Sequence, residues 1–135
     1  MRFTEIAIDT GSRKIIDITD KVREFCRDQG DGLCLVFAPH ATAGLALMET
    51  GSGSESDLED TLERLFPHKD IYKHRHGSVG HGANHILPVF VSPSLTVAVR
   101  KGLPVLGTWQ SIVFVDMNAD NPHRRVQCSF VGSPQ

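Results

Sequence analysis

Histidine is the residue type whose distribution along this chain suggests chemistry. The chain has seven histidines, and five of them (His68, His74, His76, His81 and His85) lie within residues 68–85. Imidazole is the commonest protein ligand for transition metals, and three imidazoles with an open fourth position form a catalytic zinc-type site. The cluster therefore predicts a site for a divalent metal. Its simplest alternative is a polar, solvent-exposed loop in which the histidines do no chemistry.

The spacing of the histidines fits more than one local geometry. His74 and His76 would share a face of an extended segment, because they are two residues apart. His81 and His85 would share a face of a helical turn, because they are four residues apart. His40 stands at the mouth of two apolar segments, where a rigid element can supply a ligand. No strict motif such as H-E-x-x-H is present, so spacing alone leaves the ligand set open.

Glu49 and Gln110 are candidates for catalysis. Glu49 ends an apolar run, where a carboxylate serves as a general base, a metal ligand or a group that orients a histidine. An ordinary strand-end carboxylate is an equal alternative. Gln110 begins an apolar segment, and its amide would need hydrogen-bond partners if it were buried. The neighbouring Trp109, the only tryptophan, is explained most simply as an anchor in the core.

Basic residues near the ends of the C-terminal strands could form a phosphate-binding edge. They are Arg100, Lys101, Arg124 and Arg125. Solvated strand ends explain them more simply. The sequence contains no P-loop, no G-x-G-x-x-G after a strand and no G-x-S-x-G, so serine and cysteine nucleophiles lack local support.

Length and composition describe one ordinary globular domain over residues 1–135. A net charge of −2 excludes a strongly basic nucleic-acid-binding protein. No apolar stretch approaches the roughly 18 residues of a membrane span, and no secretory signal opens the chain, so we expect a cytoplasmic protein without membrane partners. Cys26, Cys34 and Cys128 are far apart in sequence and form no C-x-x-C, so no disulfide framework is expected.

The N-terminal half is predicted to start with a hairpin of two strands over residues 2–9 and 14–18. Thr19 is the expected N-cap of a helix over residues 20–29, which Gly30 ends. Two continuous apolar runs, 33–38 and 43–48, then indicate strands buried on both faces.

The C-terminal half contains the clearest helix and several strands. Ser54 and Asp57 resemble a capping box, after which Leu58, Leu62 and Leu65 form an apolar stripe that ends before Pro67. Residues 68–85 are a glycine-containing loop, with a short helical turn near 83–91. Strands follow at 95–99, 111–115 and 124–131. Together these elements predict an α+β domain with a mainly antiparallel sheet and two or three helices.

Several short segments occur in an order that resembles the YjbQ family. They are His40-Ala41-Thr42-Ala43-Gly44, Glu49, Tyr72-Lys73-His74, His85-Ile86 and Gly107-Thr108-Trp109-Gln110. The resemblance covers nearly the whole chain. It implies an α+β fold, a compact homotrimer and a histidine pocket that can hold a metal ion.

The resemblance also implies roles for particular residues. His40, His74 and His85 match the family histidines and become the expected metal ligands, with zinc as the preferred ion and magnesium as a second choice. Glu49 and Gln110 become the expected catalytic residues. Trp109, Arg124 and Arg125 are expected to contact a small phosphorylated or anionic ligand.

Members of the family are often labelled secondary thiamine-phosphate synthases. This activity joins a hydroxymethylpyrimidine diphosphate to a thiazole phosphate and releases pyrophosphate. A metal-dependent hydrolase and a non-catalytic trimer that binds a metal or small anion are the alternatives. A trimer whose histidines pack at subunit seams is a third.

The chain departs from the family pattern around its histidines. Met48 stands where many members have asparagine, and the stretch Arg75–Gly82 replaces acidic residues with His76 and His81. Imidazole ligands favour zinc and similar metals, whereas carboxylates favour magnesium. The departure therefore predicts a shift of metal preference toward zinc.

Overall fold

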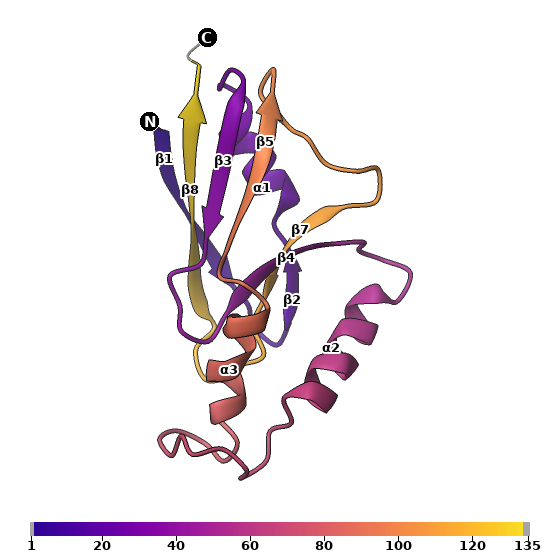
Figure 1. The fold of residues 1–135 in the computed structure, drawn as a ribbon, viewed down its shortest axis with the longest axis vertical. Helices are drawn as coiled ribbons and strands as arrows, with labels where there is room; N and C mark the ends of the chain where they lie inside the picture. The colour runs from indigo at the N-terminus through magenta and orange to yellow at the C-terminus, as the bar shows by residue number, and fades with distance from the viewer. Residues whose placement is uncertain (1, 134–135) are drawn as a thin grey trace.

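The computed structural model describes residues 2–133 and forms three helices and eight strands within that range (Figure 1). The elements are β1 (Arg2–Asp9), β2 (Ile15–Asp17), α1 (Thr19–Cys26), β3 (Gly32–Phe37), β4 (Gly44–Met48), α2 (Ser54–Leu65), α3 (Gly82–Phe90), β5 (Ser94–Arg100), β6 (Leu103–Pro104), β7 (Ser111–Val115) and β8 (His123–Gly132). All strand pairs are antiparallel, which confirms the α+β prediction. Within residues 2–133, no helix is long and apolar enough to cross a membrane.

The strands form two sheets that pack as layers. The larger sheet has the order β1-β8-β3-β5-β6, and the smaller one has the order β2-β7-β4. The main core lies between the larger sheet and a layer made of α1 and the smaller sheet, as the shared cluster of Val22, Val36 and Phe114 shows. A second core joins α2 and α3 to the other face of β7, through Leu62, Leu87 and alternate β7 residues. The helices that flank the histidine loop therefore rest on a rigid strand.

The predicted N-terminal hairpin is wrong, because its two strands enter different sheets. β1 pairs with β8, and β2 pairs with β7. Thr10 donates its backbone N–H to Pro122 O, and Asp116 donates its own to Lys14 O, so the connecting turn is held by residues more than a hundred positions away. Long-range pairing overrides the local turn signal here.

Both proposed helix caps also differ from the prediction. Thr19 is the first residue of α1, and its N–H donates to Asp17 Oδ1 at 2.9 Å. At α2, Gly53 occupies the cap position with a φ of 91°, which favours glycine. Ser54 caps nothing and instead donates its hydroxyl to Glu49 Oε1 at 3.1 Å. The helical turn near 83–91 is confirmed as α3.

β3 is not buried on both faces, as its apolar run suggested. Cys34 and Val36 point into the core, whereas Leu33, Leu35 and Phe37 point outward and are 53%, 41% and 37% exposed. The outer side of the larger sheet is thus an apolar surface in the isolated chain.

The three cysteines, far apart in sequence, gather in the main core and are all free and buried. Hydrogen bonding to Cys34 and burial raise the pKa of the Cys26 thiol well above its ordinary range. Hydrogen bonding to Cys128 is the first cause that raises the pKa of Cys34, to about 12. The thiols therefore act as small core side chains, as expected for Cys34.

Candidate metal centre

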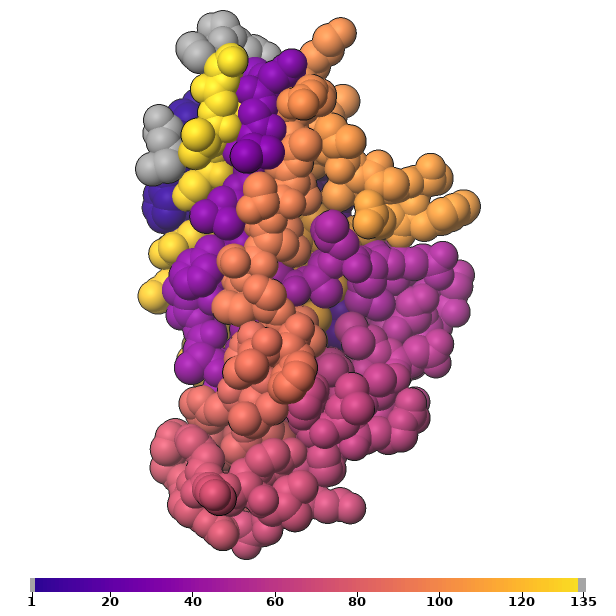
Figure 2. All heavy atoms as spheres, viewed as in Figure 1, coloured from indigo at the N-terminus to yellow at the C-terminus, as the bar shows by residue number. Residues whose placement is uncertain are grey.

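The histidine loop and α3 together carry the candidate site at one end of the molecule (Figures 1 and 2). α2 ends at Leu65, and the Tyr72 hydroxyl donates to Pro67 O at 2.9 Å, which folds the loop back on itself. Gly80, with a φ of 77°, brings the chain against the backbone of His68 before α3 begins. The loop therefore places His74 and His76 beside His85, which lies in the first turn of α3.

His74, His76 and His85 converge in this arrangement. One ring nitrogen from each lies within 4.8 Å of the others, a separation that suits ligands of one metal ion. The ring centroid of His74 lies 3.9 Å from that of His76 and 4.4 Å from that of His85. Three imidazoles from a loop and a helix thus face one point.

One atom of this group indicates that the arrangement suits a metal. His74 Nδ1 is buried and has no hydrogen-bond partner among the described residues. An unpaired buried polar atom is costly, and a metal ion would satisfy it. The donor set, three nitrogen ligands, is also one that zinc accepts.

Electrostatics keep the cluster in the form that binds metals. Desolvation, followed by the neighbouring His76 and His81, lowers the pKa of His74. Desolvation, followed by His74, His81 and His76, lowers the pKa of His85. A lowered pKa leaves these imidazoles neutral at pH 7, with lone pairs available to a metal.

Acidification should destabilise the metal-free protein. The unfolded histidines titrate near an ordinary pKa of about 6.5, whereas His74 and His85 titrate lower in the folded chain. The unfolded state therefore binds more protons below that pH, so the stability present at pH 7 is lost as the pH falls through the folded pKa values. Urea midpoints of chelator-treated protein at pH 7.5 and 5.5 measure this loss. A His85→Ala variant should lose less, and an equal loss would contradict the assignment.

A chain of hydrogen bonds leads from the surface to the cluster. Glu63 Oε2 lies 2.8 Å from His68 Nδ1, and His68 Nε2 lies 2.7 Å from the Asn84 amide. The Asn84 amide nitrogen, Nδ2, lies 3.2 Å from His81 Nδ1, and His81 Nε2 lies 3.2 Å from His85 Nε2. From the sequence, His68 was only one member of the histidine cluster, and Asn84 had no expected role. The three-residue spacing of His81 and Asn84 across the start of α3 is a signal that could have predicted their contact.

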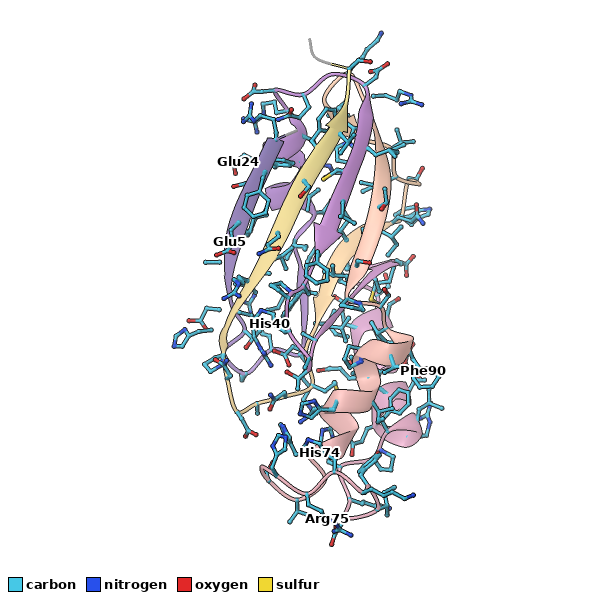
Figure 3. The ribbon with its side chains drawn as sticks, turned by 60° about the vertical axis from the view of Figure 1, so that its left-hand side comes forward. Glu5, Glu24, His40, His74, Arg75 and Phe90 are labelled. Atoms are coloured by element: carbon cyan, nitrogen blue, oxygen red, sulfur yellow. The ribbon has the colours of Figure 1, made fainter. Side chains whose placement is uncertain are left out.

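His40 lies outside the group of three. Its Nε2 accepts the backbone N–H of Arg125 at 3.0 Å, beside the larger sheet (Figure 3). Burial, followed by the charge of Arg124, lowers its pKa. Of the three expected ligands, the single chain thus brings together His74 and His85, and His76 takes the third place.

The two expected catalytic residues are placed apart from the cluster. Glu49 is exposed and follows β4, and its Oε1 accepts the hydroxyl of Ser54, the first residue of α2, at the end of that helix opposite the histidine loop. The 12 residues of α2 span about 18 Å. Gln110 accepts the backbone N–H of Gly107 at 2.8 Å and so holds the turn before β7.

Trp109 is no core anchor, because it is 74% exposed. It lies on the segment between β6 and β7 that projects from the body of the molecule in Figure 2, where this segment is orange. Val105, on the same segment, and Leu103, at the start of β6, are also exposed. This part of the chain therefore leaves several apolar side chains exposed to solvent.

The two arginines expected at a phosphate differ sharply. Arg124 is buried, and its guanidinium donates to Asp116 Oδ2 at 2.7 Å and to Thr42 Oγ1 at 2.8 Å. The Arg124 guanidinium, which was expected to contact a ligand, is therefore already hydrogen-bonded within the protein. Arg125 is half exposed and lies 3.5 Å from Glu5.

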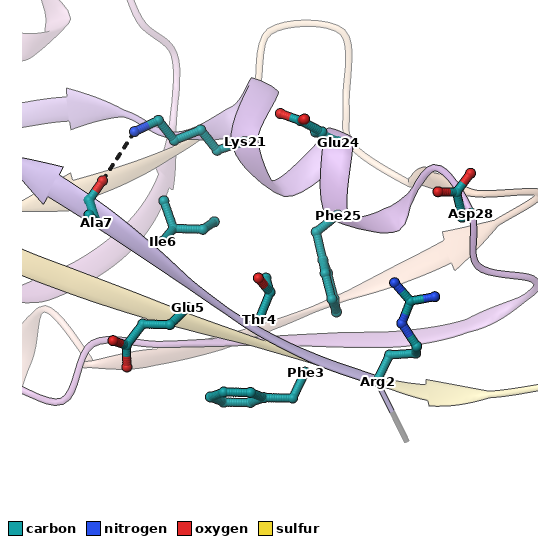
Figure 4. A pocket seen from close by; sticks show the side chains of 10 residues that line it. All are labelled: Arg2, Phe3, Thr4, Glu5, Ile6, Ala7, Lys21, Glu24, Phe25 and Asp28. Carbon is teal, nitrogen blue, oxygen red and sulfur yellow. Dashed lines mark hydrogen bonds between the residues drawn. The ribbon is translucent and has the colours of Figure 1, made fainter.

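A separate hollow of about 480 Å³ lies between β1 and α1 (Figure 4). Its lining mixes the basic Arg2 and Lys21 with the acidic Glu24 and Asp28. Lys21 Nζ donates to Ala7 O at 3.2 Å across it. The residues that line this hollow include no histidine or cysteine, so it offers no soft metal ligand.

The fold and the cluster define a class: a small single α+β domain that presents converging histidines on a loop and a short helix. The chain belongs to the YjbQ family, because the family model described as "UPF0047 protein YjbQ-like" matches residues 4–133. The resemblance found in the sequence is thereby confirmed.

Relatives and solved structures agree with this assignment. A UPF0047 protein of Mycobacterium bovis is 63% identical, in an alignment that covers 92% of this chain and 96% of the length of the relative. A UPF0047 protein of Archaeoglobus fulgidus is 38% identical over 90% of this chain and 94% of its own. A hypothetical protein from Aeropyrum pernix K1 superposes with a TM-score of 0.90 at 28% identity, over 98% of this chain and 100% of its own. A YbjQ-like protein of unknown function from Sulfolobus solfataricus P2 gives 0.91 at 25% identity, over 98% and 97% of the two chains.

Proposed function

We propose that this protein binds one divalent transition-metal ion per chain, zinc by preference, through His74, His76 and His85. The observation that carries the proposal is the convergence of three ring nitrogens within 4.8 Å of one another. The buried, unpartnered Nδ1 of His74 supports it independently. The group of three contains no carboxylate, which favours zinc, nickel or copper over magnesium.

Metal content tests the proposal directly. Wild-type protein without an affinity tag, reconstituted with zinc at neutral pH and desalted, should hold about one ion per chain by elemental analysis. His85→Ala should hold less than about a tenth of that, because it loses one member of the converging group of three. His123→Ala is the matched control, since His123 is exposed at the start of β8 and should keep wild-type content. A wild type without metal would refute the proposal.

We also propose that the protein assembles with copies of itself, as the trimer that the family resemblance implies. Support comes from the outer face of the larger sheet, where Leu33, Leu35 and Phe37 are exposed along β3 and Val131, opposite Leu33 on β8, is exposed too. Glu5 and Arg125 border this face with opposite charges, so a second copy meets no net repulsion there. An exposed apolar row on a small domain marks an interaction surface.

Substitution on β3 tests the assembly. Leu35→Asp should reduce the mass measured by light scattering from about three chains to one, because it places a charge in the centre of the apolar face. Leu65→Asp is the control, since Leu65 is 63% exposed on α2, away from that sheet. A monomeric wild type, or a trimeric Leu35→Asp, would contradict the proposed surface.

Thiamine-phosphate synthase activity is the finer prediction that the resemblance adds. A divalent metal would supply charge neutralisation for the departing pyrophosphate. Arg125 is the arginine left to meet a phosphate, because Arg124 is bonded to Asp116 and Thr42. Metal-loaded protein given both substrates should then release thiamine phosphate, and Arg125→Ala should reduce that rate. No product from a zinc-loaded wild type would refute the activity and leave the metal-binding proposal standing.

A further inference from the structure

We infer that His81, held in place by its contacts with Asn84 and Asp120, supplies a fourth imidazole to the metal. The inference rests on the proposed zinc site and concerns the position that three ligands would leave open. It assigns a role to a histidine that the family resemblance does not explain, and for which the four-residue spacing to His85 predicted only a shared face. It also changes what the site can do, because a fourth protein ligand replaces a water molecule.

The position of His81 fits a shared metal. Its Nε2 lies 3.2 Å from His85 Nε2. Two ligands about 2.0–2.1 Å from a tetrahedral zinc ion are separated by about 3.3–3.4 Å, so this spacing is close to that of two ligands on one ion. The ring centroids of His81 lie 5.6 Å from those of both His74 and His76, so all four rings surround one small volume. His81 is itself buried, at 8% exposure.

The Asn84 amide joins His68 to His81. Its Oδ1 lies 2.7 Å from His68 Nε2, and its Nδ2 lies 3.2 Å from His81 Nδ1. Glu63 Oε2 lies 2.8 Å from His68 Nδ1, so this series of contacts is anchored on α2. Asn84 therefore holds the His81 ring from its Nδ1 side and leaves Nε2 toward His85.

Ligation through Nε2 would place the ring proton of His81 on Nδ1. The Asp120 carboxylate, whose Oδ2 lies 3.5 Å from Nδ1, can accept that proton. The Asn84 amide, whose Nδ2 lies 3.2 Å from Nδ1, can accept it after a half-turn that exchanges its nitrogen and oxygen. Nε2, the atom that faces His85, is then free for the metal. A metal-binding histidine characteristically donates its other N–H to a carboxylate or carbonyl in this way.

Four imidazoles would leave the ion without an exchangeable water. A closed shell of protein ligands is typical of metal retention, whereas an open position is typical of hydrolytic catalysis. The inference therefore favours a protein that holds its metal over a metal-dependent hydrolase. It also places His76 and His81, the two departures from the family pattern, in one site.

Cobalt is the probe that tests the inference, because its visible bands report coordination number and ligand type. We compare wild type, His81→Ala, Asn84→Leu and the control His123→Ala, each loaded with one equivalent of Co²⁺. Zinc affinity is measured on the same proteins by competition with a chromogenic chelator. Circular dichroism establishes that each variant is folded, and Asn84→Leu keeps all the histidines if His81→Ala does not fold.

Wild type should show intense bands of four-coordinate cobalt, and His81→Ala should show altered bands as water enters. Both His81→Ala and Asn84→Leu should weaken zinc binding by about 10–100-fold, and His123→Ala should change neither readout. Unchanged bands and affinity in a folded His81→Ala would overturn the inference while leaving the proposed zinc site intact. A wild type that binds neither cobalt nor zinc would instead refute the proposed site itself.

Discussion

Replacement of Arg124 by methionine is expected to lower the free energy of unfolding by about 3–5 kcal/mol. The side chains of Arg124 and Asp116 are only 4% and 1% exposed, and their ion pair has a 2.7 Å hydrogen bond. Removing the guanidinium leaves a buried carboxylate whose pKa burial already raises, and it also removes a donor from Thr42. Urea denaturation of the purified variants measures the loss.

The adjacent arginine provides the matched control. Arg125→Met removes an exposed guanidinium that lies 3.5 Å from Glu5, so it should cost less than about 1 kcal/mol. The double variant Arg124→Met, Asp116→Leu should recover part of the loss, because it removes both charges together. If Arg124→Met were as stable as wild type, the guanidinium would not be a structural group, and the expected role at a phosphate would return.

Local sequence patterns predict which segments form helices and strands, but they do not predict which strands pair with one another. The stripe of Leu58 and Leu62 marks α2, and alternation marks β8, because each pattern repeats over several residues. Residues 2–9 and 14–18 also show strand patterns, yet the turn between them resembled a hairpin. Their real partners lie 96 to 128 positions further along the chain, and no local pattern encodes such a distance.

The apolar run of β3 shows a second limit of local patterns. Leu33, Leu35 and Phe37 are as hydrophobic as the residues that point into the core, so the run predicts burial on both faces. In the single chain only one face is covered. Hydrophobicity alone therefore does not distinguish a strand face packed in the core from one that the single chain leaves exposed.

The sequence predicted that the candidate site consists of histidines, but not which histidines converge. The density of histidines over residues 68–85 indicated a metal site, and the two-residue spacing of His74 and His76 indicated a shared face. The family pattern instead favoured His40, which the fold places against Arg125. Which histidines meet depends on how the loop turns back at Gly80, where a φ of 77° lets it reach α3.

Glycine 82 is expected to decide whether His74 reaches its place. A Gly82→Ala substitution would put a Cβ atom 2.5 Å from Tyr72 Cβ and 3.3 Å from His74 Cβ. The Tyr72 Cβ is fixed to the backbone, so the segment that carries His74 must move away from α3. Since His85 lies three residues into the same helix, the two ligands would separate. We expect at least about a tenfold loss of zinc affinity, of the size seen when the supports of metal ligands are removed.

The same substitution should cost only about 1–3 kcal/mol of stability, as overpacking usually does. Gly11→Ala is the control, because its φ of 54° strains an alanine while the added Cβ meets no atom within 4 Å. That variant should lose comparable stability and keep wild-type zinc affinity. Affinity that falls in Gly82→Ala but not in Gly11→Ala would separate ligand placement from general destabilisation. Equal affinity in both variants would mean that the loop adapts, and that contact between α3 and Tyr72 does not position His74.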